Sequence, residues 1–247
     1  MKKRLFIGTS GWDYRHWKGI FYPKDLSQDK WLEYYSGCFN CVELNVTFYR
    51  MVEKATFSAW RKRTPKNFHF VVKGSRFITH IKRLKDCADP LKLLLHNSGG
   101  LKEKLAAILW QLPPGFKKDL ARLENFLKLL KKTGLRYAFE LRNLSWFDPE
   151  TYSLLKKYNC SLCVADSGSR FPTVKESTAD FLYLRFHGGG SLYSSDYSDK
   201  DLKSWADFSA RFKHKDVFAF FNNDAYGYAV KNAQKFQQLC YNIDKRS

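Results

Sequence analysis

The sequence lacks any long apolar run. None of its 247 residues lie in a stretch that approaches the roughly 18 consecutive apolar residues needed to cross a bilayer, and the basic residues 2–4 are followed by only three apolar residues before Gly8. We therefore expect no signal peptide, no membrane anchor and no membrane partner. In the cytoplasmic location that this suggests, the six cysteines stay reduced.

Several short catalytic motifs are also missing. The chain has no Gly-x-Gly-x-x-Gly after its first strand-like segment, which counts against a dinucleotide-binding sheet. It has no Gly-Lys dipeptide, which excludes a Walker A phosphate loop, and no Gly-x-Ser-x-Gly, which excludes a hydrolase nucleophile elbow. It has no His-Glu-x-x-His, the zinc motif of many metalloproteases.

Acidic residues are scarce. The 24 Asp and Glu stand against 43 Lys and Arg, which gives a net charge of +19. Residues 61–85 contain no acidic residue and carry the basic side chains Arg61, Lys62, Arg63, Lys66, Lys73, Arg76, Lys82, Arg83 and Lys85, interleaved with aromatic ones. Such a stretch attracts polyanions through phosphate contacts and counterion release. A solvated basic face would account for it equally well.

Aromatic residues, in contrast, are abundant. The 21 Phe, 14 Tyr and 7 Trp supply enough apolar surface to exclude disorder along most of the chain. Short apolar runs alternate with helical patterns without a linker, so we expect one domain over residues 1–247. The pattern predicts strands at residues 4–8, 41–48, 68–73, 105–111, 137–141, 161–165, 181–186 and 217–221, and helices at residues 29–37, 55–63, 89–97, 117–133, 149–158, 199–212 and 226–241.

Eight strands that alternate with helices indicate an α/β fold, a single (β/α)8 barrel of the triosephosphate-isomerase type. A doubly wound open sheet is the alternative. Residues 166–180, between the sixth and seventh strands, are short and lack a helical pattern. This βα unit is therefore the candidate for a degenerate one.

A resemblance to a known family covers nearly the whole chain. Its motifs are Ile7-Gly8-Thr9-Ser10-Gly11-Trp12, Val42-Glu43-Leu44-Asn45-Val46-Thr47-Phe48-Tyr49-Arg50, Ile78-Thr79-His80, Leu109-Trp110-Gln111-Leu112-Pro113-Pro114, Phe139-Glu140-Leu141-Arg142, Tyr183-Leu184-Arg185-Phe186-His187-Gly188 and Phe221-Asn222-Asn223-Asp224. They resemble the domain-of-unknown-function 72 family, also called YecE-like. The resemblance implies a triosephosphate-isomerase-type barrel and an activity that is not established. Where the family usually has Phe-Gln-Leu-Pro-Pro, this chain has Trp110.

Polar residues concentrate where the predicted strands end. The carboxyl ends of barrel strands form the active face, so side chains placed there at a period of two point into one cavity. Glu43, Asn45, Thr47 and Tyr49 share one side of the second predicted strand, and the fifth, seventh and eighth strands repeat the pattern. The candidates for acid/base catalysis are Glu43, Glu140, Asp166, His187 and Asp224. The alternative is that Glu43 with Arg185, and Glu140 with Arg142, form buried structural ion pairs.

The remaining strand-end residues are candidates for substrate binding. They are Ser10, Trp12, Asn45, Tyr49, Lys73, His80, Gln111, Arg142, Trp146, Arg185, Gly188, Asn222 and Asn223. Lysine and arginine suit anions, and arginine binds carboxylate or phosphate through two parallel hydrogen bonds. The glycines of His187-Gly188-Gly189-Gly190 would let backbone N–H groups approach a phosphate.

A divalent metal is considered and not favoured. His187, Glu140 and Asp166 could hold one ion, but six histidines are few for a metal-dependent barrel hydrolase. The Cys38/Cys41 and Cys160/Cys163 pairs have zinc-like spacing, yet each straddles the start of a buried strand, so we interpret them as buried thiols. We assign no metal ligands, no other cofactor and no oligomeric state.

Two functional hypotheses follow. The first is an enzyme that binds an anionic or phosphate-bearing substrate, nucleic acid included, at the barrel mouth and acts by acid/base chemistry, for example as a hydrolase of a phosphate- or sugar-containing substrate. The second is a nucleic-acid-binding protein without catalysis that uses residues 61–85. The first requires the polar strand-end residues to converge in a pocket, and the second requires a continuous basic surface.

Overall fold

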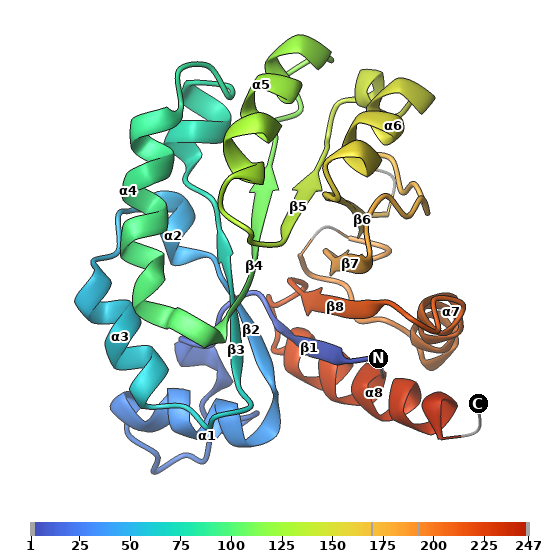
Figure 1. Ribbon diagram of the computed structural model, residues 1–247. Helices are drawn as coiled ribbons and strands as arrows, with labels where there is room; N and C mark the ends of the chain where they lie inside the picture. Colours follow the sequence, from blue (N-terminus) through green and yellow to red (C-terminus); the bar gives the residue numbers. More distant parts are fainter. Residues whose placement is uncertain (1–2, 169, 192, 246–247) are drawn as a thin grey trace.

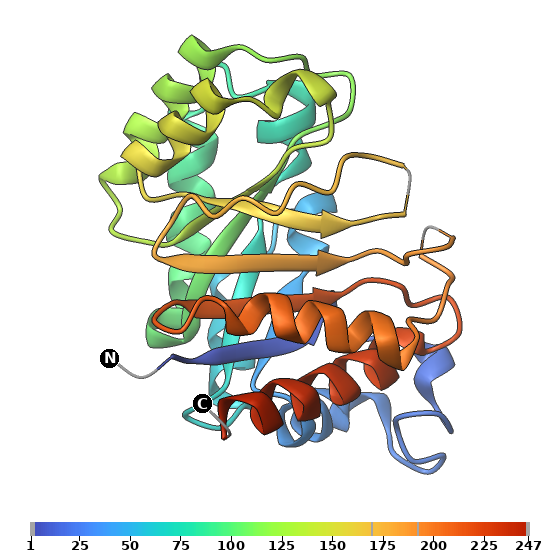
Figure 2. The ribbon, with the colours of Figure 1, turned by 90° about the vertical axis from the view of Figure 1, so that its right-hand side faces the viewer.

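The strands form one parallel sheet in the computed structural model, which describes residues 3–168, 170–191 and 193–245. They are β1 (Leu5–Thr9), β2 (Cys41–Leu44), β3 (His69–Lys73), β4 (Leu105–Gln111), β5 (Tyr137–Glu140), β6 (Ser161–Asp166), β7 (Phe181–Phe186) and β8 (Asp216–Phe221). Their order is β1-β8-β7-β6-β5-β4-β3-β2, and Figure 2 shows β6 and β7 side by side, pointing the same way. The sheet curls into a nearly closed barrel, as the sequence predicted.

Helices surround the strands on the outside (Figure 1). They are α1 (Trp31–Cys38), α2 (Val46–Tyr49), α3 (Lys54–Lys62), α4 (Ala88–Ser98), α5 (Leu120–Lys131), α6 (Pro149–Lys157), α7 (Asp199–Ala210) and α8 (Tyr228–Asp244), with the short turns η1 (Arg15–Trp17), η2 (Gln28–Lys30), η3 (Phe77–Ile81), η4 (Gly99–Lys104) and η5 (Leu144–Trp146). Asp119 and Asp148 cap α5 and α6, and Ser198 and Asp201 form a capping box at α7. No helix in the described part of the chain is long and apolar enough to span a bilayer.

Each strand is buried on both faces, because its side chains alternate between the barrel interior and the helices. On β7, Leu182 and Leu184 pack outward in the larger core, whereas Tyr183 belongs to the smaller core inside the barrel. Aromatic rings fill the lower interior, where Phe6 and Phe218 stack with their centroids 4.4 Å apart. This packed floor leaves only the carboxyl ends of the strands for a site.

The barrel is closed between β1 and β2 mainly by side chains. Among the described residues, the backbones of these two strands meet at a single bridge, between Ser10 and Glu43. The Tyr35 hydroxyl accepts from the Thr9 N–H at 2.9 Å and lies 3.2 Å from the Cys41 carbonyl. A Cβ at Gly8 would lie 2.0 Å from that same carbonyl, so only glycine permits this close approach.

The second strand ends earlier than predicted. The prediction ran to residue 48, but β2 ends at Leu44 and α2 follows at once. Thr47 Oγ1 lies 2.8 Å from the Leu44 carbonyl and 2.6 Å from the Lys73 carbonyl, and either contact holds the chain in its turn away from the sheet. The predicted alternation of Glu43, Thr47 and Tyr49 along one strand face is therefore wrong, because residues 46–49 are helical.

The connection between β6 and β7 contains no helix among its described residues, so the expectation of a degenerate unit is confirmed. The Thr178 hydroxyl instead binds the backbone at the start of β6. It accepts from the Leu162 N–H at 2.7 Å and donates to the Cys160 carbonyl at 2.6 Å. The same segment places the Phe171 ring over the barrel, where it contacts the His187 ring and the Arg142 guanidinium.

Candidate functional site

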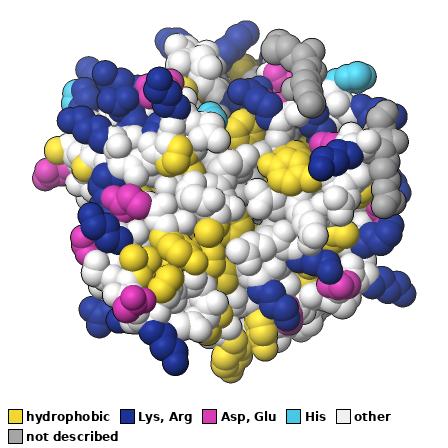
Figure 3. Space-filling view, turned by 90° about the horizontal axis from the view of Figure 1, so that it is seen from below, with side chains coloured by type: hydrophobic (Ala, Val, Ile, Leu, Met, Phe, Trp, Pro, Cys, Tyr) yellow, Lys and Arg dark blue, Asp and Glu magenta, His cyan; other side chains and the backbone are white. Residues whose placement is uncertain are grey.

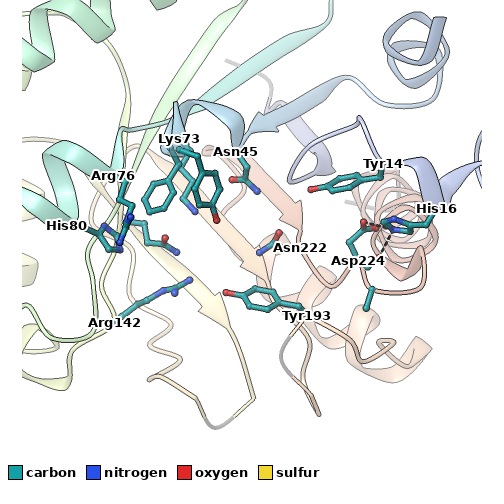
Figure 4. Close-up of a pocket in the computed structure, with 14 residues that line it drawn as sticks. Tyr14, His16, Asn45, Lys73, Arg76, His80, Arg142, Tyr193, Asn222 and Asp224 are labelled. Carbon is teal, nitrogen blue, oxygen red and sulfur yellow. Dashed lines mark hydrogen bonds and ion pairs between the residues drawn. The ribbon is translucent and has the colours of Figure 1, made fainter. Parts of the chain in front are cut away.

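A cavity of about 580 Å³ opens at the carboxyl ends of the strands (Figure 4). Among the described residues, every strand except β6 contributes to its wall, either by its last residues or by the loop after it. The lining residues are Tyr14, His16, Asn45, Phe48, Tyr49, Lys73, Arg76, His80, Gln111, Arg142, Tyr193, Asn222, Asp224 and Ala225. In Figure 4, Arg76, His80 and Arg142 lie on one side and His16 and Asp224 on the other.

Beneath the cavity lies a buried network of charges centred on Arg185. Its guanidinium makes two hydrogen bonds to Glu43, 3.0 Å from Nε to Oε2 and 2.7 Å from Nη2 to Oε1, and a third to Glu140. Tyr183 and Ser10 also donate to Glu43, each at 2.7 Å. All the hydrogen-bonding positions of Glu43 face protein groups rather than the cavity, and its side chain is fully buried.

Glu140 is equally enclosed. It accepts from Gln111 at 2.8 Å, from Arg142 Nε at 2.7 Å and from Arg185. Burial alone would raise the pKa of Glu140, but the guanidinium groups of Arg185 and then Arg142 outweigh burial and hold that pKa well below its usual value. The pKa of Glu43 is lowered too, because the attraction of Arg185 outweighs burial. Both carboxylates therefore stay ionised.

His187 completes this network as a neutral ring. Burial and then the Arg185 charge lower its pKa to about 4, although Glu140 opposes the shift. Its Nδ1 lies 3.1 Å from the Asn222 amide nitrogen and its Nε2 lies 3.3 Å from Glu140 Oε2. The tautomer that satisfies both contacts has its proton on Nε2, since Asn222 then donates to Nδ1. His187 is therefore a hydrogen-bond donor to Glu140 at neutral pH.

Cations dominate the side of the cavity formed after β3 and β5. Arg142 uses its Nε on Glu140 and packs its guanidinium 4.7 Å from the Phe171 ring centroid, which leaves its other nitrogens toward the cavity. Lys73 is 6% exposed and its Nζ lies 4.2 Å from the Phe48 ring centroid. Burial, followed by repulsion from Arg185, lowers the pKa of Lys73 to about 7. His80 is neutral as well, because burial and then Lys73 lower its pKa to about 4.

Asp224 is the carboxylate that lines the cavity. Trp17 Nε1 donates to its Oδ1 at 2.7 Å, and His16 Nε2 lies 2.9 Å from both its Oδ2 and its backbone carbonyl. Among the described residues, Oδ2 has no hydrogen bond of good geometry. Burial raises the pKa of Asp224 to about 6, and the contacts with Trp17 and His16 offset only part of that rise. This carboxyl group therefore exchanges its proton near neutral pH.

The structure separates the predicted site residues into three groups. Those that line the cavity are Asn45, Tyr49, Lys73, His80, Gln111, Arg142, Asn222 and Asp224. Those in the network beneath it are Ser10, Glu43, Glu140, Arg185 and His187. Those that lie outside both are Trp12, Trp146, Asp166, Gly188 and Asn223.

The residues outside the cavity have structural contacts of their own. Asp166 ends β6 on the outward-facing side and accepts from the Gly168 N–H at 3.2 Å. The Trp146 indole donates to the Phe116 carbonyl at 2.6 Å. The Gly188 N–H, which the sequence offered to a phosphate, donates instead to the Tyr197 hydroxyl at 3.0 Å. Trp12 lines a smaller neighbouring cavity of about 270 Å³.

Some cavity residues were not selected from the sequence. They are His16, Arg76 and Ala225. Tyr14, Phe48 and Tyr193 also line the cavity, and the sequence places these aromatic residues at the active face, where their rings could stack on a ligand. His16, Arg76 and Ala225 lie on turns after the strands, and no strand period points to such positions. Arg76 could have been selected from the sequence as a residue near the cavity, because it lies three residues after the end of β3. Trp110 lies outside the cavity, because it faces α5 and packs against Phe126.

The described residues contain no group of three or more His, Cys, Asp or Glu that could hold a metal ion. Asp166 faces away from His187 and Glu140, so the three residues considered together as ligands do not converge. The six cysteines are free, and all except Cys38 are fully buried.

Comparisons with known proteins place the chain among proteins whose activity is not established. Residues 6–246 match the family described as "Protein of unknown function DUF72". The UPF0759 protein YunF of Bacillus subtilis is 31% identical, over 95% of this chain and 94% of that protein. The crystal structure of a DUF72 family protein from Thermotoga maritima aligns with a TM-score of 0.87 at 30% identity, covering 96% of this chain and 99% of that one. A xylose isomerase domain protein from Planctomyces limnophilus, with a TM-score of 0.57 and 9% identity over 86% of this chain and 91% of that one, shares the barrel fold alone.

Proposed function

The chain belongs to the DUF72 family, and from this premise we propose that it is an enzyme that binds a small anionic substrate in the barrel mouth and transfers protons there. The observation that carries the proposal is the composition of the cavity wall. Two arginines, Arg76 and Arg142, together with the partly protonated Lys73, face a single carboxylate, Asp224, across it. Lys73 and Arg142 are largely buried above the charge network, whereas Arg76 is exposed at the edge of the cavity. An anion that reaches Lys73 and Arg142 is therefore attracted in a region of lowered dielectric.

The arginines are the proposed anchors of the substrate. Arg142 is fixed by its bond to Glu140 and by the Phe171 ring, so it loses little side-chain entropy when it binds an anion. Arg76 has no ion-pair or hydrogen-bond partner among the described residues and reaches the same side of the cavity. A carboxylate or a phosphate on the substrate would pair with these two groups.

Asp224 is the proposed proton-transfer group. A general acid or base is most effective when its pKa is close to the working pH, and burial brings the pKa of Asp224 to about 6. Its Oδ2 is the oxygen left without a good hydrogen bond, so the proton would sit on that atom. Glu43 and Glu140 are assigned a different role, because their oxygens are occupied by the cations that they hold in place.

The test is binding of simple anions. We expect phosphate, citrate and phosphoglycolate to raise the melting temperature at pH 7 and to bind in calorimetry, and the double variant Arg76→Gln/Arg142→Gln to weaken this binding at least tenfold. Lys62→Gln, on the exposed end of α3, removes one charge far from the cavity and serves as the control. Equal binding by the variant and the native protein would refute an anion site in the mouth.

A nucleic acid is the second candidate ligand, and the rim of the cavity favours it. Tyr49 is 76% exposed and Phe77 is 46% exposed. Arg76 precedes Phe77 in the sequence, and Lys82 Nζ lies 5.7 Å from the Phe77 ring centroid. Exposed rings next to cations suit stacked bases and phosphates. The basic residues 61–85 do not form one surface, however. Arg61 and Arg63 precede β3 and pair with Glu103 and Glu33, while Arg76 and Lys82 follow it. On the face seen in Figure 3, Lys and Arg are spread around the edge among Asp and Glu.

A cytoplasmic location is part of the same proposal. Five of the six free cysteines are buried thiols within or against the barrel, and the fold places no disulfide among them. A reducing compartment is where such thiols persist.

A further inference from the structure

Two buried lysines in this fold have opposite surroundings. Lys104 is 4% exposed, and its Nζ donates to the Arg61 carbonyl at 2.7 Å and to the carbonyl and hydroxyl of Thr64 at 2.7 Å and 2.9 Å. All three of its hydrogens are therefore used. Lys73 is 6% exposed, yet among the described residues its Nζ has no hydrogen-bond or ion-pair partner.

The surroundings of the Lys73 amine favour the neutral form, because burial and then the Arg185 charge disfavour an ammonium there. Its Nζ lies 4.2 Å from the Phe48 ring centroid, and this contact attracts an ammonium only weakly and does not replace the hydrogen bonds that are lost on burial. Glu43 and Glu140, the carboxylates nearest in the fold, are already occupied by Arg185, Arg142 and their other donors. A buried ammonium that lies beside other cations and lacks a carboxylate of its own loses its proton easily.

The position of the amine is also that of a reactive group. Lys73 is the last residue of β3, so its stem is fixed by the barrel while its Nζ reaches the cavity floor. Arg76 and Arg142, the proposed anchors of the anion, lie on the same side of the cavity. A molecule held by its anionic group at these arginines would present an adjoining carbon to the amine.

We propose that Lys73 is a nucleophile that forms an imine with the carbonyl carbon of an anionic substrate. This deepens the proposed function, because it names the substrate class as a carbonyl compound that bears a carboxylate or phosphate. It assigns Lys73 a covalent role in place of an anion-binding one.

The step balances without any other reactant. The lone pair of neutral Nζ attacks the carbonyl carbon, and one N–H proton moves to the carbonyl oxygen to give a carbinolamine. The C–O bond then breaks, and the oxygen leaves as water with the second N–H proton, while the C=N bond forms. The step involves no oxidation or reduction. Protonation of the imine nitrogen then makes the C–H bond of the carbon next to the imine acidic.

The test traps the imine in the native protein. The chain is incubated at pH 7 with pyruvate, or with butanone as a neutral carbonyl of similar size, in the presence of cyanoborohydride, which reduces the imine to a stable secondary amine. Peptide mass mapping then gives the extent of modification at each lysine. Each carbonyl is normalised to its rate with free Nα-acetyl-lysine, so that intrinsic reactivity cancels.

We expect modification at Lys73 by pyruvate to be at least tenfold faster than at any surface lysine. With a pKa of about 7, roughly half of Lys73 is neutral at pH 7, against on the order of one part in a few thousand for an ordinary lysine, which leaves ample margin for steric hindrance. Lys104 is the internal control, and we expect it to remain unmodified. Lys73→Met should abolish the fast modification and leave that of the surface lysines unchanged.

The outcomes separate the two proposals. Fast trapping of pyruvate but not of butanone supports both the amine nucleophile and the anion site. Equal normalised trapping of the two supports the nucleophile and refutes the anionic substrate. Modification of Lys73 no faster than that of surface lysines, in protein that retains its native circular dichroism, overturns the inference.

Discussion

At the scale of single residues, Glu140 tests whether the charges beneath the cavity are structural. Glu140→Gln removes the carboxylate that pairs with both Arg185 and Arg142, so it leaves the buried Arg185 with Glu43 alone and the partly exposed Arg142 without a carboxylate partner among the described residues. We expect a loss of about 3–5 kcal/mol in the free energy of unfolding, the usual cost of breaking a buried pair. Urea unfolding at pH 7 measures it.

The control for this variant is Glu53→Gln, at an exposed glutamate with no ion pair among the described residues, which should change stability by less than about 0.5 kcal/mol. If Glu140→Gln were as stable as the native protein, Glu140 would return to the group of acid/base candidates, because the network would not depend on its charge.

Asp224 gives a second prediction, which concerns pH. Its pKa is about 6 in the folded protein and near 3.8 in the unfolded chain, so the folded state binds the extra proton between these values. The stability that this proton contributes is complete below pH 4 and is lost as the pH rises through 6. Asp224→Asn should therefore stabilise the protein at pH 8, by about 2 kcal/mol once partial exposure to the cavity is allowed for, and have little effect at pH 4.

The measurement is the difference between the two proteins in urea unfolding across pH 4 to 8, with Asp25→Asn at an exposed position as the control. A stabilisation that did not grow with pH would show that the Asp224 carboxyl group is not the one with the raised pKa.

Most of the site residues could be selected from their identities and their places at strand ends. Their division into residues that line the cavity and residues buried beneath it could not. Glu140 and Asp224 look equivalent in the sequence, since both are carboxylates at strand ends. Their difference arises from neighbours that are distant along the chain: Arg185 is 45 residues from Glu140 and Trp17 is 207 residues from Asp224. No local pattern contains that information.

At the scale of elements, the contact between β1 and β2 depends on the Tyr35 hydroxyl. It bridges Thr9 on one strand and the Cys41 carbonyl on the other. Tyr35→Phe keeps the ring and removes the hydrogen bonds of the hydroxyl to the buried Thr9 N–H and Cys41 carbonyl, so we expect it to destabilise the fold by about 1–3 kcal/mol. Tyr34→Phe, one position away on the same helix and 37% exposed, is the matched control and should be nearly neutral.

Thermal and urea unfolding of the two variants decide the point. Equal stabilities would mean that packing of the ring, rather than the hydroxyl, holds β1 against β2.

All eight strands and seven of the helices could be predicted, because parallel strands buried on two faces form short apolar runs and the helices between them are amphipathic. The second strand was extended too far since Val46 and Phe48 continue the β-type composition. What ends it is the Thr47 hydroxyl, which contacts the carbonyls of Leu44 and of Lys73 on the next strand. A tertiary contact overrode local propensity there.

At the scale of the whole molecule, the net charge of +19 predicts salt-dependent binding if nucleic acid is a ligand. The double variant Arg76→Glu/Lys82→Glu, at the rim, should weaken binding to a single-stranded oligonucleotide and reduce the slope of log K against log salt by about 2. Arg61→Glu/Lys62→Glu, before β3, changes the net charge equally and should have a much smaller effect.

Fluorescence anisotropy titrations at several salt concentrations measure both quantities. Equal losses for the two double variants would indicate a non-specific effect of net charge, and binding that did not respond to salt would leave the basic residues as a solvated surface.

The pairing of β1 with β8 sets an order of events during synthesis. Of the eight strands described, β1 leaves the ribosome first and its ladder partner leaves last, and the ion pair beside β1 joins residues 212 positions apart. Until β8 emerges, β1 can be held only by Tyr35 and a few other side chains on the β2 side. The barrel therefore cannot be completed until β8 has been synthesised, and the nascent chain carries an unpaired strand edge, of the kind that chaperones protect, while the residues between β1 and β8 are being made.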